Sequence, residues 1–199
     1  MKQKKIETHK IGLVGQAPSR RGDPRKPLAG PNGQKIARLA GMSYDELIAC
    51  RRKHLNTHNG KSGKGDAFDH AKGRVNAADV LLDWRVERIV LLGKNVARCF
   101  GFRDLPFLAE ISIYGRRFLI FPHPSGTNRW WNERQNERRA RQLLQRFLRG
   151  EGVSTERVDV PLGRGRLVQV ARGKPKHYNA EEIKKRTRWP RGSAQETLG

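Results

Sequence analysis

Short apolar runs and stretches of helical spacing alternate along the first part of the chain. The runs 10–15 (KIGLVG) and 88–93 (RIVLLG) are typical of buried strands, because each is short, almost wholly apolar and ends in glycine. Apolar residues recur at helical spacing between 36 and 48, where a break is expected at 41–43. A second helical face, which includes Val75, is predicted before the second run.

The alternation continues toward residue 149. Segment 54–57 is predicted as a weak strand, and a helix over 94–100 follows the second apolar run. Segments 111–114 and 117–121 predict a hairpin, and 132–149 predicts a helix with one apolar face. Strands and helices in alternation predict an α/β fold, a three-layer α/β/α sandwich with a mostly parallel central sheet.

The character of the sequence changes at residue 150. Segment 158–170 predicts an amphipathic hairpin, and the polar, basic stretch after it includes a helical segment at 180–186. We therefore expect an α/β domain over residues 1–149 and a basic extension over 150–199. The extension is expected to be partly disordered, or to form a small hairpin and a helix.

Composition adds a strong positive charge to this picture. The 199 residues hold 42 Lys and Arg against 19 Asp and Glu, a formal net charge of +23. Cations placed beside phosphates release condensed counterions, so the first partner to consider is a polyanion. The arginines of 132–149 are interpreted as a solvated helix face. No stretch approaches ~18 consecutive apolar residues, so we expect a soluble, cytoplasmic protein that binds no membrane.

The thiols, histidines and glycines exclude several kinds of site. Cys50 and Cys99 are too few for a disulfide framework or for the four thiolates of an iron–sulfur cluster, and both are predicted as small buried thiols. The six histidines form no metal-binding pattern. The glycines of 58–69 do not satisfy the phosphate-loop motif GxxxxGK[ST], because Asp66 follows Gly65. Neither a metal nor a cofactor is expected.

Three loops that follow predicted strands carry polar groups suited to a planar, hydrogen-bonding ligand. Ligands of open α/β sheets bind at the carboxyl ends of the strands, which is where these loops lie. Gln16 and Asn56 each offer a donor and an acceptor in one plane, and His123 brings a titratable imidazole. A loop cap at Gln16 and an Asx turn at Asn56 are the structural alternatives.

These loops resemble the motifs of the uracil-DNA glycosylase superfamily. Segment 15–18 (GQAP), with 27–33 (PLAGPNG) downstream, looks like its first motif and glycine loop, and 123–126 (HPSG) resembles its second motif. Asn56 stands where the family places its base-reading asparagine. The resemblance covers roughly residues 10–149 and leaves the basic extension unmatched.

The resemblance implies a monofunctional DNA glycosylase that hydrolyses the N-glycosidic bond of a flipped uracil or modified pyrimidine in DNA. By that similarity His123 would donate to the base carbonyl, Asn56 would read the Watson–Crick edge, and Gln16 with the backbone of Ala17 would position the water. The implied DNA contacts are Ser19, Arg20, Ser125, Gly126, Arg129 and Trp130. Arg129 and Trp130 are the candidates for a wedge inserted into the duplex, and a monomer is the simplest expectation.

Departures from the family pattern leave the substrate and the water-activating group open. Ala17 stands where many members carry Asp or Asn, so a carboxylate would come from elsewhere, such as Asp66 or Asp69. Leu28 stands where a base-stacking aromatic residue is usual, and Phe68 is its candidate substitute. Two alternatives stay open: a catalytically silent DNA-binding protein on the same fold, and an RNA- or ribosome-associated basic protein.

Overall fold

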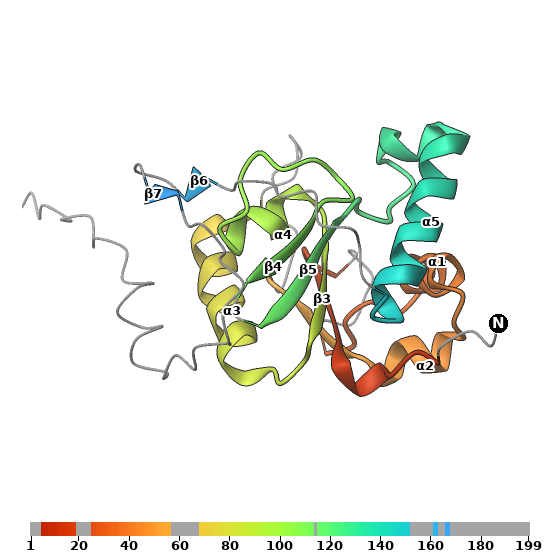
Figure 1. Cartoon of the computed structure of the whole chain (residues 1–199), viewed down its shortest axis with the longest axis horizontal. Helices are drawn as coiled ribbons and strands as arrows, with labels where there is room; N and C mark the ends of the chain where they lie inside the picture. Colours follow the sequence, from red (N-terminus) through yellow and green to blue (C-terminus); the bar gives the residue numbers. More distant parts are fainter. Residues whose placement is uncertain are drawn as a thin grey trace, which may run out of the picture.

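A five-stranded sheet forms the centre of the computed structural model, which describes residues 5–18, 25–56, 68–113, 115–151 and two short strands further on (Figure 1). The strands are β1 (Ile11–Gly15), β2 (Arg51–His54), β3 (Arg88–Leu92), β4 (Glu110–Ile113) and β5 (Arg116–Phe121). Their order is β2-β1-β3-β5-β4; the first four are parallel, and β4 is antiparallel to β5. The predicted α/β class and the predicted hairpin are confirmed.

Helices cover both faces of this sheet (Figure 1). One face carries α1 (Pro31–Ala40), α2 (Tyr44–Ala49) and α5 (Arg134–Leu148), and the other carries α3 (His70–Asp83) and α4 (Lys94–Cys99). Successive side chains of a strand point to opposite faces, so Leu13 packs into the first core cluster and Val14 into the second. The sheet and its two helical layers thus enclose two apolar cores.

The central and edge strands differ in sequence because they differ in environment. Every residue of β1 and β3 is buried, as a parallel strand covered on both faces requires. The edge strand β2 has the sequence RRKH and no buried residue. Charged edge strands resist pairing with other chains, but they show no apolar pattern. The prediction of a strand at 54–57 is therefore wrong by three residues, because β2 begins at Arg51 and ends at His54.

The helix predicted between 36 and 48 is broken where the sequence indicated. Gly41 ends α1 in the left-handed conformation, with a φ of 67°, which glycine adopts without steric cost. Ser43 begins α2 with a capping box: its Oγ accepts from the Glu46 N–H at 3.1 Å, and Glu46 Oε2 accepts from the Ser43 N–H at 2.7 Å.

The buried face of α3 differs from the predicted one. Val75 is 65% exposed, and the buried residues of α3 are Gly73, Ala77 and Val80. A Cβ on Gly73 would lie 2.8 Å from Cys99 Sγ, so the glycine allows α3 to approach α4 closely. The prediction is therefore wrong for Val75, whereas Leu81 of the same predicted face is partly buried against the second core.

The C-terminal extension is described at two short strands. Pro161–Leu162 (β6) and Arg166–Leu167 (β7) pair antiparallel, in agreement with the hairpin predicted over 158–170. The helix predicted at 180–186 and the basic tail lie outside the described residues. Within the described ranges, no helix has the length and apolar character needed to cross a bilayer.

Candidate functional site

The parallel strands bring the candidate residues to one edge of the sheet. Gln16 follows β1 directly, and Asn56 and His123 each stand two residues after the ends of β2 and β5. The chain passes from β2 on one side of β1 to β3 on the other, which makes the carboxyl edge between β1 and β3 a topological switch point. Ligands of open α/β sheets bind at such points.

Gly93, directly after β3, places no side chain beside His123. Its backbone has a φ of 107°, and its N–H donates to the Phe121 carbonyl at 2.8 Å. A Cβ on Gly93 would lie 3.6 Å from the Cβ of His123. His123 therefore lies beside the end of β3, and β3 is the neighbour of β1 at a spacing of about 4.8 Å.

The backbone and the tautomer of His123 are both defined by hydrogen bonds. Its carbonyl accepts from Trp131 Nε1 at 2.7 Å and from Asn128 Nδ2 at 3.1 Å. The Ser125 N–H donates to His123 Nδ1 at 3.3 Å, so Nδ1 acts as the acceptor of the neutral ring. The proton of the neutral imidazole is then carried by Nε2, the nitrogen that can donate to a ligand.

The amide of Asn56 is held by the backbone of Asp69. Asn56 is 4% exposed, and its own N–H donates to the Gln16 carbonyl at 2.9 Å. In the amide orientation that satisfies both ends, Oδ1 accepts from the Asp69 N–H at 2.8 Å, and Nδ2 donates to Leu55 O at 3.0 Å and to Asp69 O at 3.3 Å. A carbonyl oxygen has two lone pairs, so Oδ1 retains the capacity to accept one further hydrogen bond.

The carboxylate of Asp69 has a structural partner. Its Oδ1 accepts from the Lys72 N–H at 3.0 Å and caps the first turn of α3. Asp69 is the one carboxylate among the described residues of the loop that follows β2. Asp66, the other candidate for activating water, lies outside the described residues, as do the DNA-contact candidates Ser19 and Arg20.

The residues predicted to line the base differ in exposure. Gln16 is 7% exposed, and Ala17 is half-buried. Leu28 is 6% exposed and belongs to the core cluster under α1 and α5. Phe68 is half-buried and packs edge-to-face on His70, with ring centroids 4.9 Å apart. Leu28 and Phe68 thus both pack into the protein at this edge.

His54, the last residue of β2, lies in the site and was missed by the sequence analysis. A Cβ on Gly15 would lie 2.7 Å from its Cδ2, so its ring lies across the end of β1. Its Nε2 accepts from the Leu28 N–H at 3.4 Å, and Nδ1 is buried with no partner among the described residues. Burial, with the charges of His123 and Arg52, lowers its pKa to about 4, so His54 is neutral at pH 7. Its position opposite Gly15 depends on the register of β2, which the sequence pattern did not reveal.

The loop after His123 presents polar and aromatic residues. Ser125 is half-buried, and its Oγ lies 3.0 Å from Thr127 Oγ1. Gly126 and Arg129 are exposed. Trp130 is half-buried, and its ring centroid lies 5.9 Å from that of Phe107 and 4.9 Å from that of Trp131. Trp131 also packs on Phe121, so it anchors this loop to the core.

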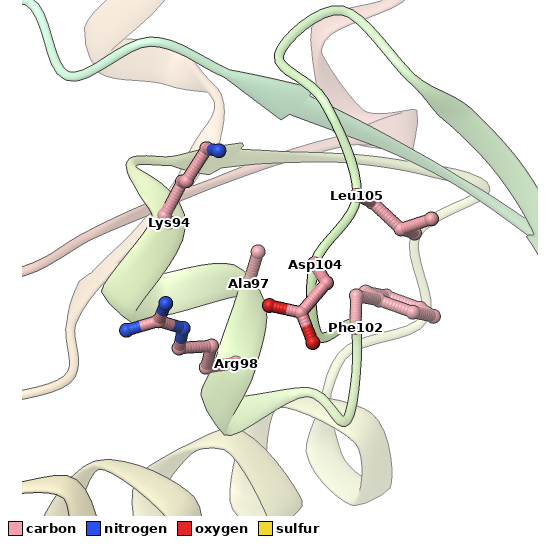
Figure 2. A pocket seen from close by; sticks show the side chains of 6 residues that line it. All are labelled: Lys94, Ala97, Arg98, Phe102, Asp104 and Leu105. Atoms are coloured by element: carbon pink, nitrogen blue, oxygen red, sulfur yellow. The ribbon is translucent and has the colours of Figure 1, made fainter. Parts of the chain in front are cut away.

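A small cleft lies between α4 and the loop that follows it (Figure 2). Its lining residues are Lys94, Ala97, Arg98, Phe102, Asp104 and Leu105. The cavity volume is about 20 Å³, which suits one water molecule and excludes a nucleobase. Among the described residues, no three His, Cys, Asp or Glu side chains form a metal-binding group. The predicted burial of Cys50 and Cys99 is confirmed, and it raises the pKa of each thiol to about 11.

The structure therefore brings Gln16, Asn56 and His123 to one edge of the sheet and adds His54, which lies across Gly15. Comparison with known proteins assigns no family to this arrangement, because neither a protein-family model nor a curated protein matches the chain. The chemistry of the site follows from the geometry of these side chains.

Proposed function

We propose that this protein is a DNA glycosylase that hydrolyses the N-glycosidic bond of a flipped uracil or modified pyrimidine, on a fold like that of the uracil-DNA glycosylase superfamily. The observation that carries the proposal is the placement of two amides and a donor imidazole at the carboxyl edge of β1, β2 and β5. A planar base with a carbonyl and an adjacent N–H is the complement of such a set.

His123 would stabilise the leaving base. When the bond between C1′ and the base nitrogen breaks, the electron pair stays with the base, and negative charge develops on its carbonyl oxygen. The Nε2–H of His123 would donate to that oxygen, while Ser125 holds the Nδ1 side of the ring. Water then bonds to C1′ and loses a proton, and the base anion takes up a proton.

Asn56 would select bases that carry an N–H on the pairing edge. Its Oδ1 already accepts from the Asp69 N–H and has one lone pair for another donor. Uracil and its 5-substituted derivatives present N3–H there, whereas cytosine presents an unprotonated N3. Because the Asp69 backbone holds the amide orientation, cytosine would leave Oδ1 facing an acceptor, which disfavours it.

Water would be positioned by Gln16 and the Ala17 backbone, and neither group is a base. The Asp69 carboxylate caps α3, so the described part of the site places most of the demand on stabilisation of the leaving group by His123. Ser125, Gly126 and the exposed Arg129 would contact the DNA strand. Arg129 suits a wedge better than Trp130, because the Trp130 ring is engaged with Phe107.

Base release from defined duplexes tests the proposal. A labelled duplex containing uracil or 5-hydroxymethyluracil is incubated with the full chain, and alkali-sensitive sites are measured under single-turnover conditions. His123→Ala should lower the rate by about 10²- to 10³-fold, because one donor to the developing anion is removed. His9→Ala is the matched control, since His9 is exposed in the 3₁₀ turn Thr8–Lys10 before β1, at the opposite edge. No release from any modified pyrimidine, or a full rate in His123→Ala, would contradict the proposal.

A second candidate, a catalytically silent DNA-binding protein on the same fold, is favoured by one observation. Ala17 provides no carboxylate in the first motif, and the Asp69 carboxylate is committed to the α3 cap. A chain that binds these duplexes tightly and releases no base would support this second candidate.

A further inference from the structure

Positive charge is concentrated on the helix α5. The helix α5 carries five arginines and one glutamate, and α1 adds Lys35 and Arg38 without an acid. On the same face, α2 carries two acids and no cation. On the opposite face, α3 carries two cations and two aspartates, and α4 carries two cations and no acid. The charge of α5, five cations minus one acid or +4, is higher than that of each other described α-helix, so the excess on α5 is more than a general property of a basic chain.

Three arginines form a row along α5. Arg134, Arg138 and Arg141 are separated by four and three residues, which places them on one face of the helix. With a rise of 1.5 Å per residue, the row is about 10 Å long. The three side chains are exposed and line a shallow hollow together with Glu137. Glu137 Oε1 lies 3.4 Å from Arg141 Nη2.

The helix α1 extends this row toward the core of the protein. Lys35 Nζ lies 4.1 Å from the centre of the Trp131 ring. Burial lowers the pKa of Lys35, while the charge of Glu137 raises it and that of Arg38 lowers it. We call Lys35, Arg38, Arg134, Arg138 and Arg141 the basic ridge.

The basic ridge begins beside the candidate site. Trp131, which lies under Lys35, also donates its indole N–H to the His123 carbonyl. The far end of α5 is fixed at the opposite edge of the sheet, where Arg88 Nη1 at the start of β3 donates to Leu148 O at 2.6 Å. The helix therefore runs away from the site (Figure 1). Arg134 is the first residue of α5 and thus the ridge arginine at its site end.

We propose that the basic ridge is a second DNA-binding surface. It binds phosphates of the part of the duplex that lies beside the extruded nucleotide. The choice of DNA as partner rests on the proposed function. Each strand of DNA advances about 3.4 Å per phosphate, so a row of about 10 Å spans about three phosphates. Guanidinium groups bind phosphate oxygens through paired N–H donors, which suits a row of arginines.

The surroundings of the ridge argue against a protein partner. Protein interfaces have a buried apolar centre. Among the described residues, the exposed large apolar side chain is Val75, and it lies on α3, one of the two helices of the opposite face. The arginines of segment 132–149, interpreted from the sequence as a solvated face, thus gain a role as phosphate contacts in the proposal.

Salt-dependent binding of an undamaged duplex tests the ridge directly. The full chain and the double variant Arg134→Gln, Arg138→Gln are titrated with a labelled duplex of about 20 base pairs, between about 50 and 200 mM salt. Near 100 mM salt, the affinity of the double variant should be lower by about tenfold or more. The slope of log K against log salt should be shallower by about 1.8, because each of the two phosphates that lose their arginine contributes about 0.9. Arg134→Lys with Arg138→Lys should keep the slope, because counterion release depends on charge.

The matched control removes the same charge at the opposite edge. Lys5 and Arg85 are exposed and precede β1 and β3, so Lys5→Gln with Arg85→Gln should leave affinity and slope close to those of the unmodified chain. Equal reductions in the two double variants, or an unchanged slope in the ridge variant, would overturn the ridge. A reduction confined to structured RNA would overturn DNA as the partner.

The ridge and the proposed reaction can fail separately. Undamaged duplex binding requires no base release, so a chain that releases no base can still show the shallower slope. If a ridge variant binds the duplex with full affinity and releases the base at the full rate, the ridge is not a DNA-binding surface, and the proposed reaction is unaffected by that result. Urea unfolding of each variant should match that of the unmodified chain, which checks that the exposed substitutions leave the fold intact.

Discussion

The carbonyl of His123 accepts two side-chain hydrogen bonds, and we predict that these bonds stabilise the loop together. Trp131→Phe removes the 2.7 Å bond from Nε1 and keeps a ring against Phe121. Asn128→Ala removes the 3.1 Å bond from Nδ2, together with the 3.2 Å bond that its Oδ1 accepts from the Trp130 N–H. Either single variant removes one of these two donors and keeps the other.

The expected magnitudes follow from these hydrogen bonds. A hydrogen bond contributes a net ~1 kcal/mol, so Asn128→Ala should lower the free energy of unfolding by about 2 kcal/mol. Trp131→Phe removes one bond and part of the apolar area of the indole, which also sums to about 2 kcal/mol. The double variant leaves the carbonyl without either donor, which adds a desolvation cost of about 1 kcal/mol. We therefore expect a total destabilisation near 5 kcal/mol and a coupling of about 1 kcal/mol.

Urea unfolding of the four proteins in the cycle, followed by circular dichroism at pH 7, measures this coupling. Asn136→Ala provides the control cycle with Trp131→Phe, because Asn136 Nδ2 donates to Trp130 O at 2.9 Å and makes no hydrogen bond to His123. The control cycle should be additive within about 0.5 kcal/mol. Additivity of the same quality in the Asn128 cycle would refute joint stabilisation and show that water replaces the missing donors.

Two further predictions concern residues beside the site. The pKa of His54 is about 4 in the fold against an ordinary 6.5, so the unfolded chain binds more protons than the folded chain between these pH values. The free energy of unfolding should therefore be highest above pH 6.5 and fall by up to about 3 kcal/mol as the pH drops to 4. Urea titrations across this pH range should show a smaller decrease for His54→Gln. Gly33→Ala would place a Cβ 1.9 Å from the Leu28 carbonyl oxygen and should lower the free energy of unfolding by about 2 kcal/mol or more. The control Gly126→Ala, whose Cβ would have no atom within 4 Å, should change the free energy of unfolding by less than about 0.5 kcal/mol. Equal effects of the two substitutions would contradict the packing around Leu28.

Elements with a strong local pattern were predicted well from the sequence. β1 and β3 are continuous apolar runs, and the break between α1 and α2 is marked by Gly41 and a capping box, so their signals lie within a few residues of chain. The order of the loops along the chain likewise indicated Gln16, Asn56 and His123. β2 was misplaced and Val75 was assigned to the buried face, because an edge strand and a helix contact depend on neighbours that are distant in the sequence.

The sequence by itself determined the alternating α/β pattern, the excess of positive charge and the polar residues that follow the strands. The tertiary structure decided which groups meet: His54 across Gly15, the Asn56 amide on the Asp69 backbone, and the His123 carbonyl on Trp131. It also decided that the arginines of α5 begin beside the site, because Arg88 fixes the far end of that helix. The physical reason is that hydrophobic spacing is a local property of the chain, whereas hydrogen-bond partners and charge clusters are set by strand register and helix packing between distant segments.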